Sequence, residues 1–207
     1  FENKQLFELG VTHSDGEIEV EKKESGNKLR EEIETISVEI KRQFEDGFTS
    51  EIRLDMHKWF RSISSLIRKG SMIFIDYGYD RNDFYRPERS EGNMICHYQN
   101  QIIKDPLKNI GYQDISASVD FTQLADSAIE EGFFIDLFTT QSMFLLSEQS
   151  LSMIENIEKD EERIMEIQKL KQLVMPNQMG DVFKCMVLGK GISPDNFEEL
   201  NHLTHTL

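Results

Sequence analysis

The residues best suited to chemistry follow a short apolar run in the first half of the chain. Residues 72–75 read MIFI, and Asp76, Tyr77 and Gly78 come directly after them. An apolar run without alternation is typical of a strand covered on both faces. Ligands of open α/β sheets bind outside the carboxyl ends of the strands, and glycine there allows a sharp turn or a close approach. Asp76 therefore either contacts a ligand or caps backbone amides, with Tyr77 covering the top of the sheet.

The segment after this run is rich in arginine. Arg81, Arg86 and Arg89 could hold an anionic group, or they could form surface ion pairs that contribute little to stability. The acidic partners available in the same segment are Asp80, Asp83, Glu88 and Glu91. Both interpretations stay open at this point.

Several other kinds of site are not supported by the sequence. The aspartates at 76, 80 and 83 lack the ligand spacing and closing glutamate of a calcium loop, so we expect no metal. Gly189 and Gly191 follow an apolar run, but no helix pattern follows them as in a phosphate loop. Cys96 and Cys185 have no CxxC spacing and are expected to be buried, reduced thiols.

The composition narrows the classes of partner. A formal net charge of −15 argues against a phosphate-binding surface, so we expect no nucleic acid. It suits either a basic partner or a simply solvated acidic surface. No stretch approaches 18 consecutive apolar residues, so no membrane-spanning segment is expected.

Strand and helix patterns alternate along the chain, which predicts an α/β sheet with helix layers. Asp120 is a suitable N-cap for the helix that follows it, and Pro176 stops a later helix. The expected strands are a hairpin over 5–24, a short strand over 51–54, and strands over 72–75, 94–98, 115–119, 133–138 and 182–188. The expected helices cover 29–44, a segment from 56 whose last turn holds Arg68 and Lys69, and 121–129, 140–154 and 160–174. In the last helix, Ile164 and Ile167 are expected to face inward.

Four sequence blocks resemble, in this order, the second half of the MidA-type methyltransferases. These blocks are FIDYGYDRNDFYRPERSEGNMICHY, QDISASVDFTQLADSAIEEGF, TQSMFLL and MGDVFKCMVLGKG. The resemblance covers residues 51–191, with a weaker likeness in the hairpin FELGVTHSDGEIEV. Members of this family use S-adenosyl-L-methionine and occur in bacteria and mitochondria. The mitochondrial member is an assembly factor for respiratory complex I and methylates an arginine of one of its subunits.

The resemblance implies a fold and a division of the chain. The fold class is α/β, the C-terminal half of a Rossmann-like class I methyltransferase sheet with an inserted β-hairpin and extra helices. Residues 1–48 would be the hairpin and helix insertion, 49–191 the C-terminal half of the methyltransferase domain, and 192–207 a polar tail. The family's Gly-rich cofactor loop should precede this chain, so the cofactor would be S-adenosyl-L-methionine with no cofactor-binding residues in this segment.

The family motifs also assign site residues. The resemblance implies catalytic roles for Asp76, Tyr77, Asp114 and Asp120, and substrate binding by Gly78, Arg89 and Gln113. The sequence departs from the family at four positions, which are Asn93, Asn100, Ser116 and Ser118. The family has histidine at residues 100 and 118, and any proton transfer by those histidines is lost here.

The function expected from the resemblance is S-adenosylmethionine-dependent methylation of an arginine in a protein. Its substrate would be a basic, arginine-containing protein, and a homodimer is one option for its assembly. A bacterial cytoplasmic location is expected, with the mitochondrial matrix as the alternative. The competing interpretation is a non-catalytic binding or assembly module with a degenerate methyltransferase fold.

Overall fold

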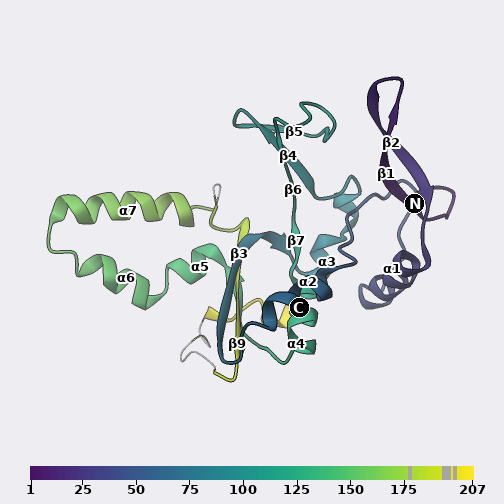
Figure 1. Ribbon diagram of the computed structural model, residues 1–207. Helices are drawn as coiled ribbons and strands as arrows, with labels where there is room; N and C mark the ends of the chain where they lie inside the picture. The colour runs from purple at the N-terminus through teal and green to yellow at the C-terminus, as the bar shows by residue number, and fades with distance from the viewer. Residues whose placement is uncertain (177–178, 193–196, 198–199) are drawn as a thin grey trace. The chain divides into compact units, whose positions relative to one another are not determined.

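A computed structural model describes residues 1–176, 179–192, 197 and 200–207 of the chain. Its internal contacts divide the chain into two compact units. Unit 1 comprises Phe1–Asp55 and Arg81–Ser118, and unit 2 comprises Met56–Asp80 and Val119–Leu207. Figure 1 shows the elements of both units. No helix in the described part of the chain is long and apolar enough to cross a membrane.

Unit 1 begins with the predicted hairpin. Strands β1 (Phe7–Ser14) and β2 (Glu17–Glu24) pair antiparallel, with Val11 opposite Val20, and form the two-stranded ribbon of Figure 1. Asp15 and Gly16 connect them with φ angles of 52° and 89°. Two consecutive residues with positive φ are typical of a tight hairpin turn, so Asp-Gly here specifies the register of the ribbon.

The helix after the ribbon is shorter than predicted. Helix α1 (Asn27–Glu39) stops before Lys41, whose φ of 54° is left-handed and incompatible with a continuing helix. Phe44 lies beyond the helix, with its ring centroid 4.9 Å from that of Phe48 and 5.7 Å from that of Tyr85. The prediction to residue 44 was wrong because an aromatic cluster, not a helix face, accounts for Phe44.

The remainder of unit 1 carries short elements. Residues 51–54 are not a strand, contrary to prediction. The elements that follow are α3 (Arg81–Phe84), the single 3₁₀ turn η1 (Pro87–Arg89), and a three-stranded antiparallel sheet in the order β5 (Gln101–Ile103), β4 (Met94–Tyr98) and β6 (Asp114–Ala117). The predicted strands near residues 94–98 and 115–119 are therefore confirmed.

Unit 2 is built on a four-stranded sheet. Its order is β7 (Val119–Asp120), β3 (Gly70–Tyr79), β9 (Phe183–Lys190) and β8 (Phe134–Thr140). Helices α2 (Met56–Ser64) and α4 (Phe121–Glu130) share a core with one face of this sheet, where Phe60, Phe121 and Phe138 are buried. The other face buries Leu137, Cys185 and Val187 against Phe144, Phe197 and Leu200.

Strand β3 differs from its prediction in two ways. It runs on through Asp76, Tyr77 and Gly78 to Tyr79 instead of ending at residue 75. It is also covered on one face only, because Met72 and Phe74 pack into the core while Ile73 and Ile75 are 57% and 45% exposed. β7 pairs with β3 only at Gly78 and Tyr79, so the earlier part of that strand edge has no partner among the described residues.

The helices of unit 2 agree with prediction in part. α2 ends at Ser64, which leaves Arg68 and Lys69 outside its last turn. The predicted helix over 140–154 is two helices, α5 (Gln141–Leu145) and α6 (Glu148–Glu155). α7 (Asp160–Val174) has the predicted limits, but none of its residues is buried. The chain ends in the 3₁₀ turn η3 (Thr204–Thr206), and Leu203 and Leu207 pack against the core that α2 and α4 form.

Candidate functional site

A row of polar residues crosses the sheet of unit 2 near the carboxyl end of β3. Asp76 on β3 lies opposite Lys184 on β9, and Lys184 lies opposite Thr140 on β8. Directly paired residues of neighbouring strands share one face of a sheet, so these three side chains belong to the same face. The adjacent pair, Tyr77 and Phe183, belongs to the opposite face, where the two rings form an edge-on contact with centroids 5.5 Å apart.

Asp76 is exposed, and one of its oxygens is engaged locally. Its Oδ1 accepts a hydrogen bond of 2.8 Å from the backbone N–H of Tyr77. The amide-capping interpretation is therefore confirmed for that oxygen. The other oxygen, Oδ2, has no hydrogen-bond partner among the described residues. An exposed carboxylate with one open acceptor position is suited to bind a cationic or hydrogen-bond-donating group.

Lys184 brings the positive charge of this row. Its ammonium donates to the backbone carbonyl of Asp181 and lies 6.0 Å from the centroid of the Tyr79 ring, within the range of a cation–π contact. Gly180 lets this segment close on the end of α7, because a Cβ there would lie 2.1 Å from the carbonyl oxygen of Val174. The segment that resembles the last family block therefore holds Lys184 beside β3.

Gly78 and Asp120 fix the junction between β3 and β7. A Cβ at Gly78 would lie 2.3 Å from the carbonyl oxygen of Val119 and 2.8 Å from the Phe121 ring, so glycine is required for this close packing. Asp120 is 2% exposed, and its Oδ1 accepts a bond of 3.1 Å from the N–H of Gln123. The predicted N-cap of α4 is thus confirmed, and it satisfies an N–H that has no partner within the helix.

The other residues that the family motifs indicate lie in unit 1. Gln113 donates from Nε2 to the carbonyls of Asp105 and Pro106, at 3.0 and 2.9 Å. Arg89 donates from Nε to the carbonyl of Asp83 at 3.0 Å. Arg89 therefore holds the backbone of α3, and Gln113 holds the loop before β6. Asp114 is exposed at the start of β6.

The structure brings Asp76, Tyr77, Gly78 and Asp120 together in unit 2, along with Lys184, which the site prediction omitted. It places Arg89, Gln113 and Asp114 in unit 1. The omission of Lys184 was avoidable. Lys184 lies near the start of the last predicted strand, over 182–188, and an antiparallel last strand brings its first residues to the carboxyl end of its neighbour.

Two arginines in the segment that follows β3 form ion pairs with carboxylates of unit 1. Arg81 is buried and pairs with the carboxylate of Glu39, the last residue of α1. Arg86 lies 3.9 Å from Glu88. The prediction of a surface ion pair is therefore confirmed for Arg86, whereas Arg81 is buried and pairs with Glu39, which was not among the predicted partners.

Glu51 is an anchoring residue that sequence reasoning missed. Its carboxylate oxygens accept from the N–H of Asn93, at 2.8 and 3.1 Å, and from the N–H of Met94 at 3.1 Å. A Cβ at Gly92, where φ is 89°, would lie 2.6 Å from Glu51 Oε1. The carboxylate thus fixes the start of β4, and no motif in the sequence around Glu51 signals this role.

Two positions at which the sequence departs from the family serve the backbone of unit 1. Gln99 and Asn100 connect β4 to β5 with φ angles of 49° and 61°, and asparagine tolerates this conformation well. Ser118 is buried, and its carbonyl accepts a bond of 2.8 Å from Arg53. Among the described residues, no group of three or more His, Cys, Asp or Glu side chains could hold a metal ion.

Comparison with known proteins identifies the family. Residues 1–139 match the family described as "putative S-adenosyl-L-methionine-dependent methyltransferase". The chain belongs to this family. No curated protein matches the chain at a significant level.

Two solved structures share the fold of this chain. Both come from Burkholderia thailandensis, are 23% identical in sequence and cover 100% of this chain. One is an uncharacterized protein with a TM-score of 0.85, of which 55% is covered. The other, described as a "likely methyl transferase" bound to S-adenosyl-homocysteine, has a TM-score of 0.87 with 53% covered. The predicted α/β class is confirmed, and the chain spans about half the length of these structures.

Proposed function

We propose that this protein is an S-adenosylmethionine-dependent methyltransferase of the MidA type, and that the chain forms the C-terminal half of its catalytic domain. The observation that carries the proposal is the family match over residues 1–139. A structural likeness over the whole chain to a protein bound to S-adenosyl-homocysteine supports it.

The free edge of β3 supports the assignment to one half of a larger domain. On the edge of β3 that faces away from β9, Gly78 and Tyr79 are the only residues paired with another strand among the described residues. Ile73 and Ile75 are exposed although their run is typical of a strand covered on both faces. Unpaired, apolar edges are rare in stable proteins because they invite other strands to pair. We infer that another strand of the whole protein pairs with this edge and that further residues cover the isoleucines.

The described residues do not by themselves fit the cofactor. Gly78, the glycine at the carboxyl end of β3, is packed against Val119 and Phe121, so no ligand can approach its backbone there. The sequence also has no G-x-G-x-G after any strand. On this proposal, the cofactor is held mainly by the part of the protein that lies outside this chain.

The acceptor that best suits the row at the carboxyl end of β3 is the guanidinium of an arginine. A planar carboxylate binds a guanidinium through paired hydrogen bonds, and Asp76 is an exposed carboxylate with an open acceptor position. The cofactor would supply an electrophilic methyl group, and Asp76 would orient the guanidinium that receives it. The net charge of −15 is compatible with a basic substrate.

The other predicted residues receive supporting roles in this proposal. Tyr77 packs on Phe183 on the opposite face of the sheet from Asp76, where it supports the end of β3 that carries this carboxylate. Asp120 acts as a positioning residue, because its buried carboxylate fixes the start of α4. Asp114 stays a candidate substrate carboxylate of unit 1, where it is exposed, and the side chains of Arg89 and Gln113 hold backbone carbonyls of the same unit.

A methyl-transfer assay with the full-length protein tests the acceptor. The protein is incubated with methyl-labelled S-adenosylmethionine and with arginine-rich peptides, and lysine-substituted peptides of equal charge serve as the control. We expect label on the arginine peptides alone. Label on the lysine peptides, or none in a protein that still binds the cofactor, would refute arginine as the acceptor but not methyl transfer. A protein that binds no cofactor would favour the non-catalytic assembly module.

A further inference from the structure

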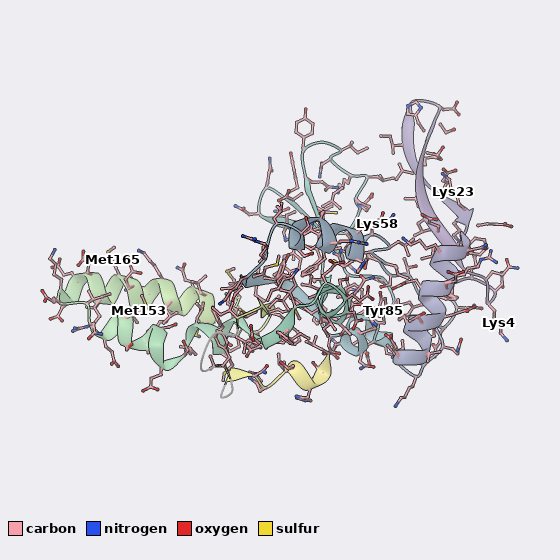
Figure 2. The ribbon with its side chains drawn as sticks, turned by 60° about the horizontal axis from the view of Figure 1, so that its bottom comes forward. Lys4, Lys23, Lys58, Tyr85, Met153 and Met165 are labelled. Carbon is pink, nitrogen blue, oxygen red and sulfur yellow. The ribbon has the colours of Figure 1, made fainter. Side chains whose placement is uncertain are left out.

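Helices α6 and α7 form an arm of unit 2 that buries very little of its apolar surface. The two helices lie side by side in both Figure 1 and Figure 2, joined by residues 156–159. The partly exposed residues of the arm are Ser150, Ile154, Ile157, Arg163, Glu166, Leu170 and Val174, and its other described side chains are exposed. No residue of α7 is buried. Exposed apolar surface of this extent on a pair of helices usually marks an interaction site.

One stripe of α7 is exposed along the whole helix and carries a regular pattern. Its residues are Asp160, Ile164, Ile167 and Lys171, at spacings of four, three and four. These spacings place all four side chains on one stripe of a helix, as at the core positions of a coiled coil. Ile164 is 55% exposed and Ile167 is 38% exposed. The stripe therefore offers two isoleucines between an acidic and a basic end.

This stripe is complementary to itself under a two-fold rotation. In an antiparallel pair of α7 helices centred between Met165 and Glu166, Ile164 of one copy meets Ile167 of the other. The same rotation places Asp160 of each copy opposite Lys171 of its partner. Core positions of antiparallel coiled coils pair in this crossed way, and a two-fold interface requires a self-complementary surface.

We propose that the α6–α7 arm binds the arm of a second copy of this chain, through the Asp160, Ile164, Ile167 and Lys171 stripe of α7. The charge pattern favours a second copy as the partner, since a stripe with one acidic and one basic end is complementary to the same stripe in antiparallel orientation. Asp160 also accepts a hydrogen bond from Arg163 on its own helix, but exposed pairs of this kind are weak and leave a carboxylate room for a second cation. The proposal does not depend on the catalytic assignment.

The dimer is expected to be weak. Two short stripes give an interface below the size typical of stable complexes, and a net charge of −15 on each chain opposes association. Added salt screens both this repulsion and the crossed Asp160–Lys171 pairs, so all variants are compared at one ionic strength.

Sedimentation velocity of the full-length protein over a concentration series tests the proposal through paired charge reversals. Asp160→Lys and Lys171→Asp should each abolish the dimer, because each homodimer then carries two like-charged pairs. An equimolar mixture of the two variants should restore it, because both crossed pairs regain opposite charges. Ile164→Asp should also abolish it, whereas Met165→Asp, an exposed position of α7 outside the stripe, should leave it unchanged.

The outcomes that would overturn the proposal are distinct. A wild-type protein that stays monomeric at about millimolar concentration contradicts it, as does a dimer that survives Ile164→Asp. Failure of the mixture to restore the dimer, with both variants retaining wild-type helical circular dichroism, also contradicts it. Restoration by mixing cannot arise from misfolded variants, so a loss of folding would not imitate the expected result.

Discussion

Asp76 and Lys184 lie directly opposite each other on β3 and β9, on the same face of the sheet of unit 2. They come from the first and last of the four blocks that resemble the methyltransferase family. Opposite charges in directly paired positions stabilise a sheet modestly, by about 0.2–1 kcal/mol. Their position at the carboxyl end of β3 is the more informative feature, because ligands of α/β sheets bind at that end.

Replacing Asp76 by asparagine in the full-length enzyme tests this position. Asparagine keeps an acceptor for the Tyr77 amide but removes the charge that would bind a guanidinium. We expect kcat/KM to fall by more than about tenfold, or ~1.4 kcal/mol, with an unchanged melting temperature. Asp15→Asn, an exposed turn position whose φ of 52° asparagine tolerates, is the matched control and should change neither quantity. A fall of less than about threefold would remove Asp76 from the site.

Replacing Gly78 by alanine should destabilise unit 2. The new Cβ would meet the carbonyl oxygen of Val119 at 2.3 Å, and backbone cannot move aside as a flexible side chain could. We expect a loss of about 1–3 kcal/mol in the free energy of unfolding, measured by urea titration. Gly10→Ala is the control, since its Cβ would make only an ordinary contact of 3.5 Å with Lys23. Equal stabilities for the two variants would contradict the close packing at Gly78.

Removing the Glu51 carboxylate should loosen the start of β4. Asn93 and Met94 donate their backbone N–H groups to it, and bonds to a charged acceptor contribute about 1.5–3 kcal/mol. Glu51→Ala should therefore speed amide hydrogen exchange at these two residues by at least tenfold. Glu8→Ala, on the exposed ribbon, should leave both rates unchanged. Equal protection in wild type and Glu51→Ala would show that the carboxylate does not anchor this segment.

Both thiols should resist modification in the folded protein. Burial raises the pKa of Cys185 to about 12, from an ordinary value of 9.0, and burial also raises the pKa of Cys96. Because the thiolate is the reactive form, neither should react at pH 8 with a disulfide reagent until guanidinium unfolds the chain. Rapid labelling of a native thiol would contradict the burial.

The raised pKa of Cys185 also has a consequence for stability. Between pH 9 and about 12, the thiol ionises in the unfolded chain but not in the folded one, so rising pH favours unfolding. Cys185→Ala removes this linkage. We therefore expect wild type to lose more stability than Cys185→Ala between pH 8 and pH 10.5, measured by urea titration.

Sequence patterns predicted the elements whose environment is contained within the chain. The hairpin turn at Asp15 and Gly16, the N-cap at Asp120 and the limits of α7 each depend on local chemistry that the sequence displays. Phe44 and Glu51 could not be predicted, because an aromatic cluster and a carboxylate that binds distant amides are set by tertiary contacts.

Two apolar patterns that predict buried residues are exposed in the structure, for a reason other than tertiary contacts within the chain. Ile73 and Ile75 on β3, and Ile164 and Ile167 on α7, lie in patterns typical of buried positions, yet all four are exposed in this chain. On the account proposed above, these patterns reflect neighbours beyond the chain, which are the rest of the catalytic domain at β3 and a second copy at α7.

Titration calorimetry with S-adenosyl-homocysteine tests the central proposal most directly. We predict that the full-length protein binds one ligand per chain with a dissociation constant at or below the micromolar range, and that residues 1–207 alone bind it poorly. Absence of binding by the full-length protein would contradict the methyltransferase function. Micromolar binding by residues 1–207 alone would contradict the proposal that the cofactor is held mainly by the rest of the protein.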